Sequence, residues 1–151
     1  KWRQSMRRIG YVLTFLFLVV PVSVNAADKS IEMLNKDPGS KERNIYSPAL
    51  VQIEPGDTVT WVATDRGHNV EFVRGAIPKG VKPFRSALGK DVSYTFSTPG
   101  AYVYKCTPHY GQGMVGIVIV GDMPENLSAI AAKKFPGKAD KRIEALLAPL
   151  T

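Results

Sequence analysis

Cysteine and histidine are the scarcest reactive residues of this chain, with one cysteine and two histidines among 151 residues. A single cysteine excludes an intrachain disulfide framework, a Cys-rich zinc module and the paired cysteines that attach a c-type haem. Glycine shows no regular period, which excludes a collagen-like chain, and the 44% of hydrophobic residues excludes general disorder. The length suits one domain with a proper core and is too small for two ordinary ones.

The net charge of +7 is unevenly distributed. Residues 1–26 contain four basic side chains and no acidic one: Lys1, Arg3, Arg7 and Arg8. Without them, 16 basic side chains face 13 acidic ones, so more than half of the net charge belongs to the first 26 residues. The excess that remains is small, and we expect no nucleic-acid partner.

The N-terminal segment has the pattern of an export signal. A basic head is followed by an apolar run over residues 9–20, by Pro21, and by small residues up to Ala26. The apolar run is shorter than the roughly 20 residues that a membrane span needs. We therefore predict a signal peptide over residues 1–26, cleaved after about Ala26. The mature domain, residues 27–151, would work outside the cytoplasm without a membrane attachment.

Alternating apolar and polar residues predict short strands in the first part of the mature chain. The last of these segments is apolar on both faces, as a central strand would be. Turn signals at 55–57 and 98–100 separate several of the segments. They cover residues 31–34, 50–53, 58–62, 69–73, 92–96, 101–106 and 115–120. Short strands at this spacing indicate an all-β sandwich or barrel.

The end of the chain has a helical pattern instead. Residues 122–125 combine acidic residues with an early proline, which is typical of a helix start, and Pro136-Gly137 would end that helix. Apolar residues recur at helical spacing on both sides of this break: Leu127, Ile130 and Ala131 before it, and Ala139, Ile143, Leu146, Leu147 and Leu150 after it. We expect two short amphipathic helices that cover a face or an edge of the β-structure.

The scarce residues gather in a pattern that suits metal binding. Cys106, His109 and Met114 share one loop between two predicted strands, with the spacing C-x2-H-x4-M, and His68 directly precedes another strand. Taken singly, each has a common structural explanation, such as a buried thiol or a core-filling methionine. Separate structural explanations do not account for three such residues in one loop of an exported chain, with a fourth before another strand. The sequence therefore predicts one site built from all four.

This donor set favours copper. A thiolate and two imidazoles with a weak axial thioether match the blue-copper arrangement. Zinc would usually take a fourth strong ligand, and the chain has no third histidine or second cysteine. Non-haem iron would require a carboxylate beside two histidines. We expect one type 1 copper ion per chain.

Two other functions remain open from these residues. Cys106 with His109 or His68 resembles the nucleophile and base of a thiol hydrolase, although no oxyanion-loop signature accompanies them. A copper carrier or storage protein without redox duty is the second alternative, although such proteins favour Met-rich or multi-Cys sites. A thiol that bound metal protects from alkylation would count against the hydrolase. Slow loss of copper to a chelator would count against the carrier or storage protein.

The chain resembles the cupredoxins, the type 1 blue copper proteins, and among them it is most similar to the pseudoazurins. The resemblance runs over nearly all of residues 27–151. Plastocyanins have a similar ligand loop, but they generally lack the two C-terminal helices. The segments that carry the resemblance are Met33–Lys36, Pro55–Val59, Asp65–Glu71, Cys106–Tyr110 and Gly113–Gly116.

The resemblance implies a Greek-key β-sandwich of about eight strands. It further implies that His68, Cys106, His109 and Met114 are the copper ligands, and that Asn69 ties the two ligand segments together by hydrogen bonds. With four ligands in place, no position is left for a substrate or oxygen. We therefore expect an electron carrier that cycles between Cu(II) and Cu(I), and not an enzyme.

The resemblance also indicates how partners dock. It suggests a monomer in the periplasm that takes electrons from a cytochrome and delivers them to a nitrite reductase or a peroxidase. His109 is the expected electron port, framed by Pro108, Gly111, Gly113 and Ala49 or Pro48. Basic residues would steer partners to it: Lys36, Arg66, Arg85 and Lys105. Gln112 stands where pseudoazurins often have a methionine, which makes the expected docking surface more polar.

Overall fold

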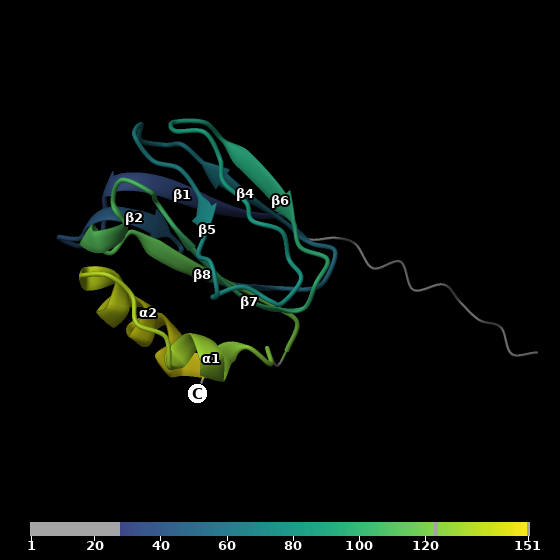
Figure 1. Ribbon diagram of the computed structural model, residues 1–151. Helices are drawn as coiled ribbons and strands as arrows, with labels where there is room; N and C mark the ends of the chain where they lie inside the picture. Colours follow the sequence, from purple (N-terminus) through teal and green to yellow (C-terminus); the bar gives the residue numbers. More distant parts are fainter. Residues whose placement is uncertain (1–27, 123, 151) are drawn as a thin grey trace, which may run out of the picture.

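Eight strands form two four-stranded sheets that face each other, and two helices cover the outer face of one sheet (Figure 1). The structure is a computed structural model and describes residues 28–122 and 124–150. The predicted signal peptide lies outside these described residues. No helix in the described ranges is long and apolar enough to cross a membrane.

The first sheet has the strand order β2-β1-β4-β6. Its strands are β1 (Asp28–Lys36), β2 (Arg43–Ser47), β4 (Thr58–Val62) and β6 (Val92–Thr95). β1 pairs with β4 in parallel and with β2 in antiparallel orientation. The loop after β4 carries His68 of the predicted metal site.

The second sheet has the strand order β3-β8-β7-β5. Its strands are β3 (Leu50–Ile53), β5 (Glu71–Phe72), β7 (Gly100–Lys105) and β8 (Val115–Val120). All six residues of β8 are buried, and the strand lies between β3 and β7. The prediction of a central strand over residues 115–120 is confirmed, and so is the all-β sandwich.

Aromatic side chains fill the space between the two sheets. The ring of Trp61 from the first sheet meets the ring of Tyr104 from the second edge to face, with centroids 5.1 Å apart. Tyr46 packs on Tyr104 in the same way, at 4.7 Å. Each such pair contributes about 0.5–1.5 kcal/mol beyond the burial of area. Cys106 and Met114 belong to this same buried cluster, so the predicted site stands on the end of the main core.

The helices pack on the other face of the second sheet. The helical segments are α1 (Leu127–Ala131), α2 (Lys138–Leu147) and the 3-10 turns η1 (Tyr110–Gln112) and η2 (Ala148–Leu150). Ala139, Ile143 and Leu147 repeat every four residues and are buried together with side chains of β7 and β8. The prediction that two short helices cover one face of the sandwich is confirmed.

Three strands differ clearly from the prediction. β1 extends beyond the predicted residues 31–34 and covers Asp28–Lys36. β2 was not predicted, because its exposed Arg43 and its Asn44, which has a φ of +52°, interrupt the alternation. The predicted strand 69–73 shortens to two residues. Its first half is instead tied to Ser86 in the loop before β6. The Val70 N–H donates to the Ser86 hydroxyl oxygen at 2.9 Å, and the Ser86 N–H donates to the Val70 carbonyl at 2.8 Å.

Candidate metal centre

The loop that carries three of the predicted ligands connects two paired strands. Lys105 at the end of β7 lies opposite Val115 at the start of β8. This pairing brings Cys106 beside Met114, and the Cys106 N–H donates to the Met114 carbonyl at 3.0 Å. The pairing of β7 with β8 therefore fixes both ends of the loop.

Backbone hydrogen bonds then shape the interior of the loop. The His109 N–H donates to the Cys106 carbonyl at 3.2 Å, and the His109 carbonyl accepts from the Met114 N–H at 3.2 Å. The Gly113 N–H donates to the Tyr110 carbonyl at 3.0 Å. Gly113 has a φ of +94°, a conformation that favours glycine and lets the chain turn back into β8. The spacing C-x2-H-x4-M thus corresponds to one tight, internally bonded turn.

His68 reaches the same place from the loop between β4 and β5. Its Nδ1 lies 3.1 Å from Nδ1 of His109 and 3.8 Å from Sγ of Cys106. Nδ1 of His109 lies 3.5 Å from the same sulfur. The ligand atoms of the three residues all lie within 4.8 Å of one another. The structure brings these three predicted ligands together into one triangle of nitrogen and sulfur donors.

Asn35 orients the His68 ring, a role that the sequence pattern does not indicate. Its side-chain oxygen lies 2.9 Å from Nε2 of His68, so that nitrogen carries the proton and Nδ1 presents a lone pair to the triangle. The Asn35 N–H in turn donates to the Asp65 carboxylate at 2.6 Å. The signal in the sequence was its place in the segment Met33–Lys36, which otherwise reads as the end of a strand.

Met114 completes the predicted set from the other side of the loop. Its side chain is fully buried in the main core, together with Cys106. The two backbone hydrogen bonds described above tie it to Cys106 and to His109. A thioether in that place is a soft, uncharged donor, which suits the axial position of a copper site.

The electrostatics of the triangle oppose charge on the protein groups. Burial raises the pKa of the Cys106 thiol, against the opposing effect of the Asn69 and His109 N–H groups that hydrogen bond to the sulfur. Burial, with the neighbouring His109, lowers the pKa of His68. A fully buried thiol with a raised pKa is the opposite of an activated nucleophile, so the site does not suit a thiol hydrolase. A metal cation reverses this situation, because a coordinating thiol is deprotonated outright.

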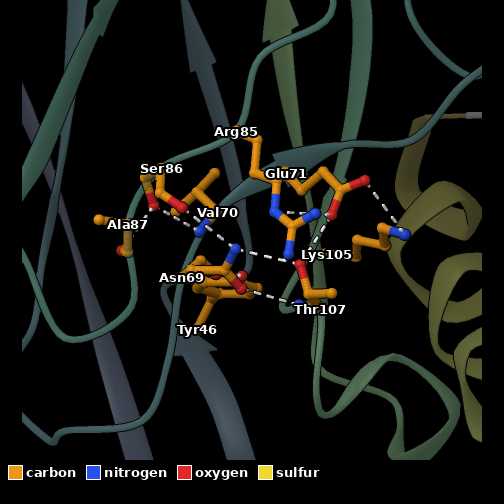
Figure 2. A network of polar contacts seen from close by, with 9 residues as sticks. All are labelled: Tyr46, Asn69, Val70, Glu71, Arg85, Ser86, Ala87, Lys105 and Thr107. Atoms are coloured by element: carbon orange, nitrogen blue, oxygen red, sulfur yellow. Dashed lines mark hydrogen bonds and ion pairs between the residues drawn. The ribbon is translucent and has the colours of Figure 1, made fainter.

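Asn69 links the two ligand segments, as the resemblance implies (Figure 2). Its side-chain oxygen accepts the Thr107 N–H at 2.8 Å, and its amide donates to the Thr107 hydroxyl at 3.0 Å. The Asn69 carbonyl accepts from the buried hydroxyl of Tyr46 at 2.6 Å. The residue after His68 is thereby bonded to the residue after Cys106, which confirms the predicted role of Asn69.

The same network continues to the protein surface through Glu71 (Figure 2). The Thr107 hydroxyl donates to the Glu71 carboxylate at 2.7 Å, and Lys105 and Arg85 lie 3.5 and 3.7 Å from its oxygens. Burial alone would raise the pKa of Glu71, but the Thr107 hydroxyl and the two cations outweigh it and hold the pKa below its usual range. The Lys105 ammonium also lies 4.7 Å from the centre of the Tyr110 ring, next to His109.

The four predicted docking cations fall into two pairs. Arg85 and Lys105 share Glu71, whereas Lys36 and Arg66 are exposed and take part in no ion pair with another described residue. His109 is partly exposed and His68 is fully buried, so His109 is the more accessible of the two histidines.

The residues expected around His109 are not all at the surface. Pro108 and Gly111 are exposed, but Gly113 is buried and lies against the start of α2, where an added Cβ would be 3.2 Å from the Cβ of Lys138. The side-chain oxygen of Gln112 accepts a hydrogen bond from the Asn44 amide at 2.7 Å. Gln112 is therefore bonded to β2 as well as adding polarity to the surface.

Comparisons with known proteins agree with this geometry. Residues 33–121 match the family described as copper binding proteins, plastocyanin/azurin family. The chain is 46% identical over 123 residues to a pseudoazurin of Paracoccus pantotrophus, covering 82% of this chain and 83% of that protein. It is 38% identical over 126 residues to a pseudoazurin of Methylorubrum extorquens, with coverages of 83% and 84%. The solved structure of native pseudoazurin from Hyphomicrobium denitrificans is similar with a TM-score of 0.78 at 42% identity, covering 83% of this chain and 99% of that one.

Proposed function

The chain belongs to the plastocyanin/azurin family of copper-binding proteins, and from this premise we propose that His68, Cys106, His109 and Met114 hold the copper ion of an exported electron carrier. It is a blue copper electron-transfer protein and not an enzyme. One observation supports the ligand set above all: one thiol and two imidazoles present their donor atoms within 4.8 Å of one another at the end of a packed core.

Bound copper supplies one-electron chemistry between Cu(II) and Cu(I). The chain's contribution is a site whose shape is set in advance. Cys106 and Met114 are fixed by the pairing of β7 and β8, and His68 is fixed by Asn35 and by the neighbouring Asn69. Side chains held by packing and by outer hydrogen bonds move little when the charge of the site changes, so each transfer needs little reorganisation.

His109 is the proposed electron port, because it is the ligand ring that a partner protein can approach. Lys36 and Arg66 add exposed positive charge beside Asn35 and His68, and neither forms an ion pair with another described residue. Charges of this kind increase the rate and the orientation of encounter more than they increase affinity. Partners with an acidic docking face fit best: a cytochrome as donor, and a nitrite reductase or a peroxidase as acceptor, in the periplasm.

The test is the rate at which the copper-loaded mature protein, residues 27–151, exchanges electrons with a copper nitrite reductase and with a cytochrome c. Stopped-flow rates should fall as ionic strength rises, because salt screens exposed charges. Lys36→Ala should lower the rate several-fold at low salt. Lys29→Ala is the matched control, since Lys29 is exposed at the opposite end of β1. Equal effects of the two substitutions, or no dependence on salt, would contradict the proposed docking surface.

A further inference from the structure

The start of α2 lies against the outer side of the ligand loop, backbone to backbone. Gly137, which precedes α2, has a φ of +56°, and a Cβ added there would overlap the carbonyl oxygen of Gly111 and lie 3.2 Å from its carbon. A Cβ added at Gly113 would lie 3.2 Å from the Cβ of Lys138. Helix and loop therefore touch at two positions where glycine permits an approach that other residues would prevent.

The opposite side of the loop is held by β2. Gln112 accepts the hydrogen bond from Asn44 at 2.7 Å, and Asn44 adopts a positive φ that presents its side chain to the loop. Arg142 of α2 forms an ion pair with Glu42 next to β2, which joins the two flanking elements to each other. The turn η1 thus lies between a strand of the first sheet and a helix packed on the second.

We propose that α2 positions the ligand loop and that Gly137 is the positioning residue through which it acts. The proposal rests on the copper site described above. The His109 carbonyl accepts from both the Gln112 and the Met114 N–H groups. A displacement of Gly111 therefore reaches His109 through its bonded neighbour Gln112, and reaches Met114 through the same carbonyl.

Packing of the helix on the sheet does not by itself require this contact. The buried face of α2, which consists of Ala139, Ile143 and Leu147, lies against β7 and β8 and accounts for the attachment of the helix. Gly137 lies outside that face and is exposed, and the three atoms nearest to a Cβ added there all belong to Gly111 of the loop. Its contact bears on the shape of the loop, and so on the relative placement of His109 and Met114.

The test compares Gly137→Ala with Gly80→Ala in the mature protein. Gly80 also has a positive φ, of +86°, so alanine is strained there too, but its Cβ enters open space. In the copper-free protein, amide hydrogen exchange of Gly113 and Met114 should rise about tenfold in Gly137→Ala, as expected for a locally loosened segment, and should stay unchanged in the control. After copper loading, the visible spectrum should shift in Gly137→Ala alone.

Unchanged exchange at Gly113 and Met114, with faster exchange confined to α2, would overturn the proposal, because the helix would then yield and not the loop. If Gly137→Ala does not fold, Leu147→Ala loosens α2 from its far end, and exchange at Gly113 and Met114 should rise together with that of the helix. Exchange confined to the helix would again overturn the proposal. Because these readings use copper-free protein, a failure of the copper site itself is seen separately, as a wild-type protein without a visible band.

Discussion

The two segments that meet at the metal centre are held in different ways. His68 is fully buried, its ring is oriented by Asn35, and its neighbour Asn69 is bonded into the core through Tyr46. His109 lies in a turn whose backbone hydrogen bonds are mostly internal to the turn, and the residue is partly exposed to solvent. The two segments therefore differ in role: the first supplies one ligand that is fixed by the core, and the second supplies the other three ligands and the proposed docking surface.

The largest expected effect comes from the point that both segments share. Cys106 is the only thiol of the chain and lies 3.8 and 3.5 Å from the two imidazole nitrogens. Cys106→Ser should abolish the intense thiolate-to-copper absorption completely, because a hydroxyl at this place is not a thiolate donor. The measurement is the visible spectrum after one equivalent of Cu(II). A remaining intense band would show that the sulfur is not a ligand.

Replacing each histidine by glycine tests the comparison directly. Both His68→Gly and His109→Gly should lose the blue band, since each removes one of the two nitrogen donors. Added imidazole should restore most of the band in His109→Gly, because that position opens to solvent, and should not restore it in His68→Gly, because that ring is fully buried. Equal rescue of both variants would remove the distinction between the two segments.

The link between the segments should matter for stability and for the site together. Asn69→Ala removes two hydrogen bonds to Thr107 and should lower the free energy of unfolding by about 2–4 kcal/mol, because a partly buried N–H loses its partner. Asn126→Ala is the matched control, since Asn126 makes an equivalent pair of bonds to the backbone of Ala101. Urea unfolding should show similar losses for both. Only Asn69→Ala should shift the copper spectrum, and a shift in both would contradict the account.

The smallest effect is expected at the surface end of the network. The pKa of Glu71 is lower in the folded chain than in the unfolded chain, so the unfolded chain binds its proton more tightly. The carboxylate therefore stabilises the fold above its ordinary pKa of about 4.3, and this contribution is lost as the pH falls through the folded-state pKa. Glu71→Gln should cost about 1 kcal/mol or less at pH 7.

The pH dependence supplies the control for that variant. Wild type and Glu71→Gln, both copper-free, should differ in unfolding free energy at pH 7 and converge toward acidic pH, because protonation removes the contribution in the wild type as well. Urea titrations at several pH values measure this difference. A gap that widens as the pH falls would have the wrong sign for a carboxyl with a lowered pKa.

Much of the fold could be predicted from the sequence because its signals are local. The strands 50–53, 58–62 and 115–120 begin and end where alternation or continuous apolar runs predicted them. β2 escaped prediction because its partner is β1, which lies before it across a charged loop, and pairing decides its conformation. The strand over 69–73 was predicted too long, since the loop residue Ser86 takes the hydrogen bonds of Val70.

Prediction of the metal site from the sequence has the same limit. His68, Cys106, His109 and Met114 were predicted by residue type and spacing, which are readable without coordinates. The orientation of His68 by Asn35 and the contact of Gly137 with Gly111 join segments far apart in the chain, and no pattern within either segment reports them. Pairings of this kind arise only when the sandwich has closed.

The most direct test of the account is the visible absorption spectrum of the mature protein, residues 27–151, titrated with Cu(II) and then treated with ascorbate and an oxidant. We expect an intense thiolate-to-copper band that saturates at one equivalent, disappears on reduction and returns on oxidation, while Cys106 becomes protected from alkylation. A colourless protein whose Cys106 is alkylated at the same rate with and without copper would contradict the proposed ligand set.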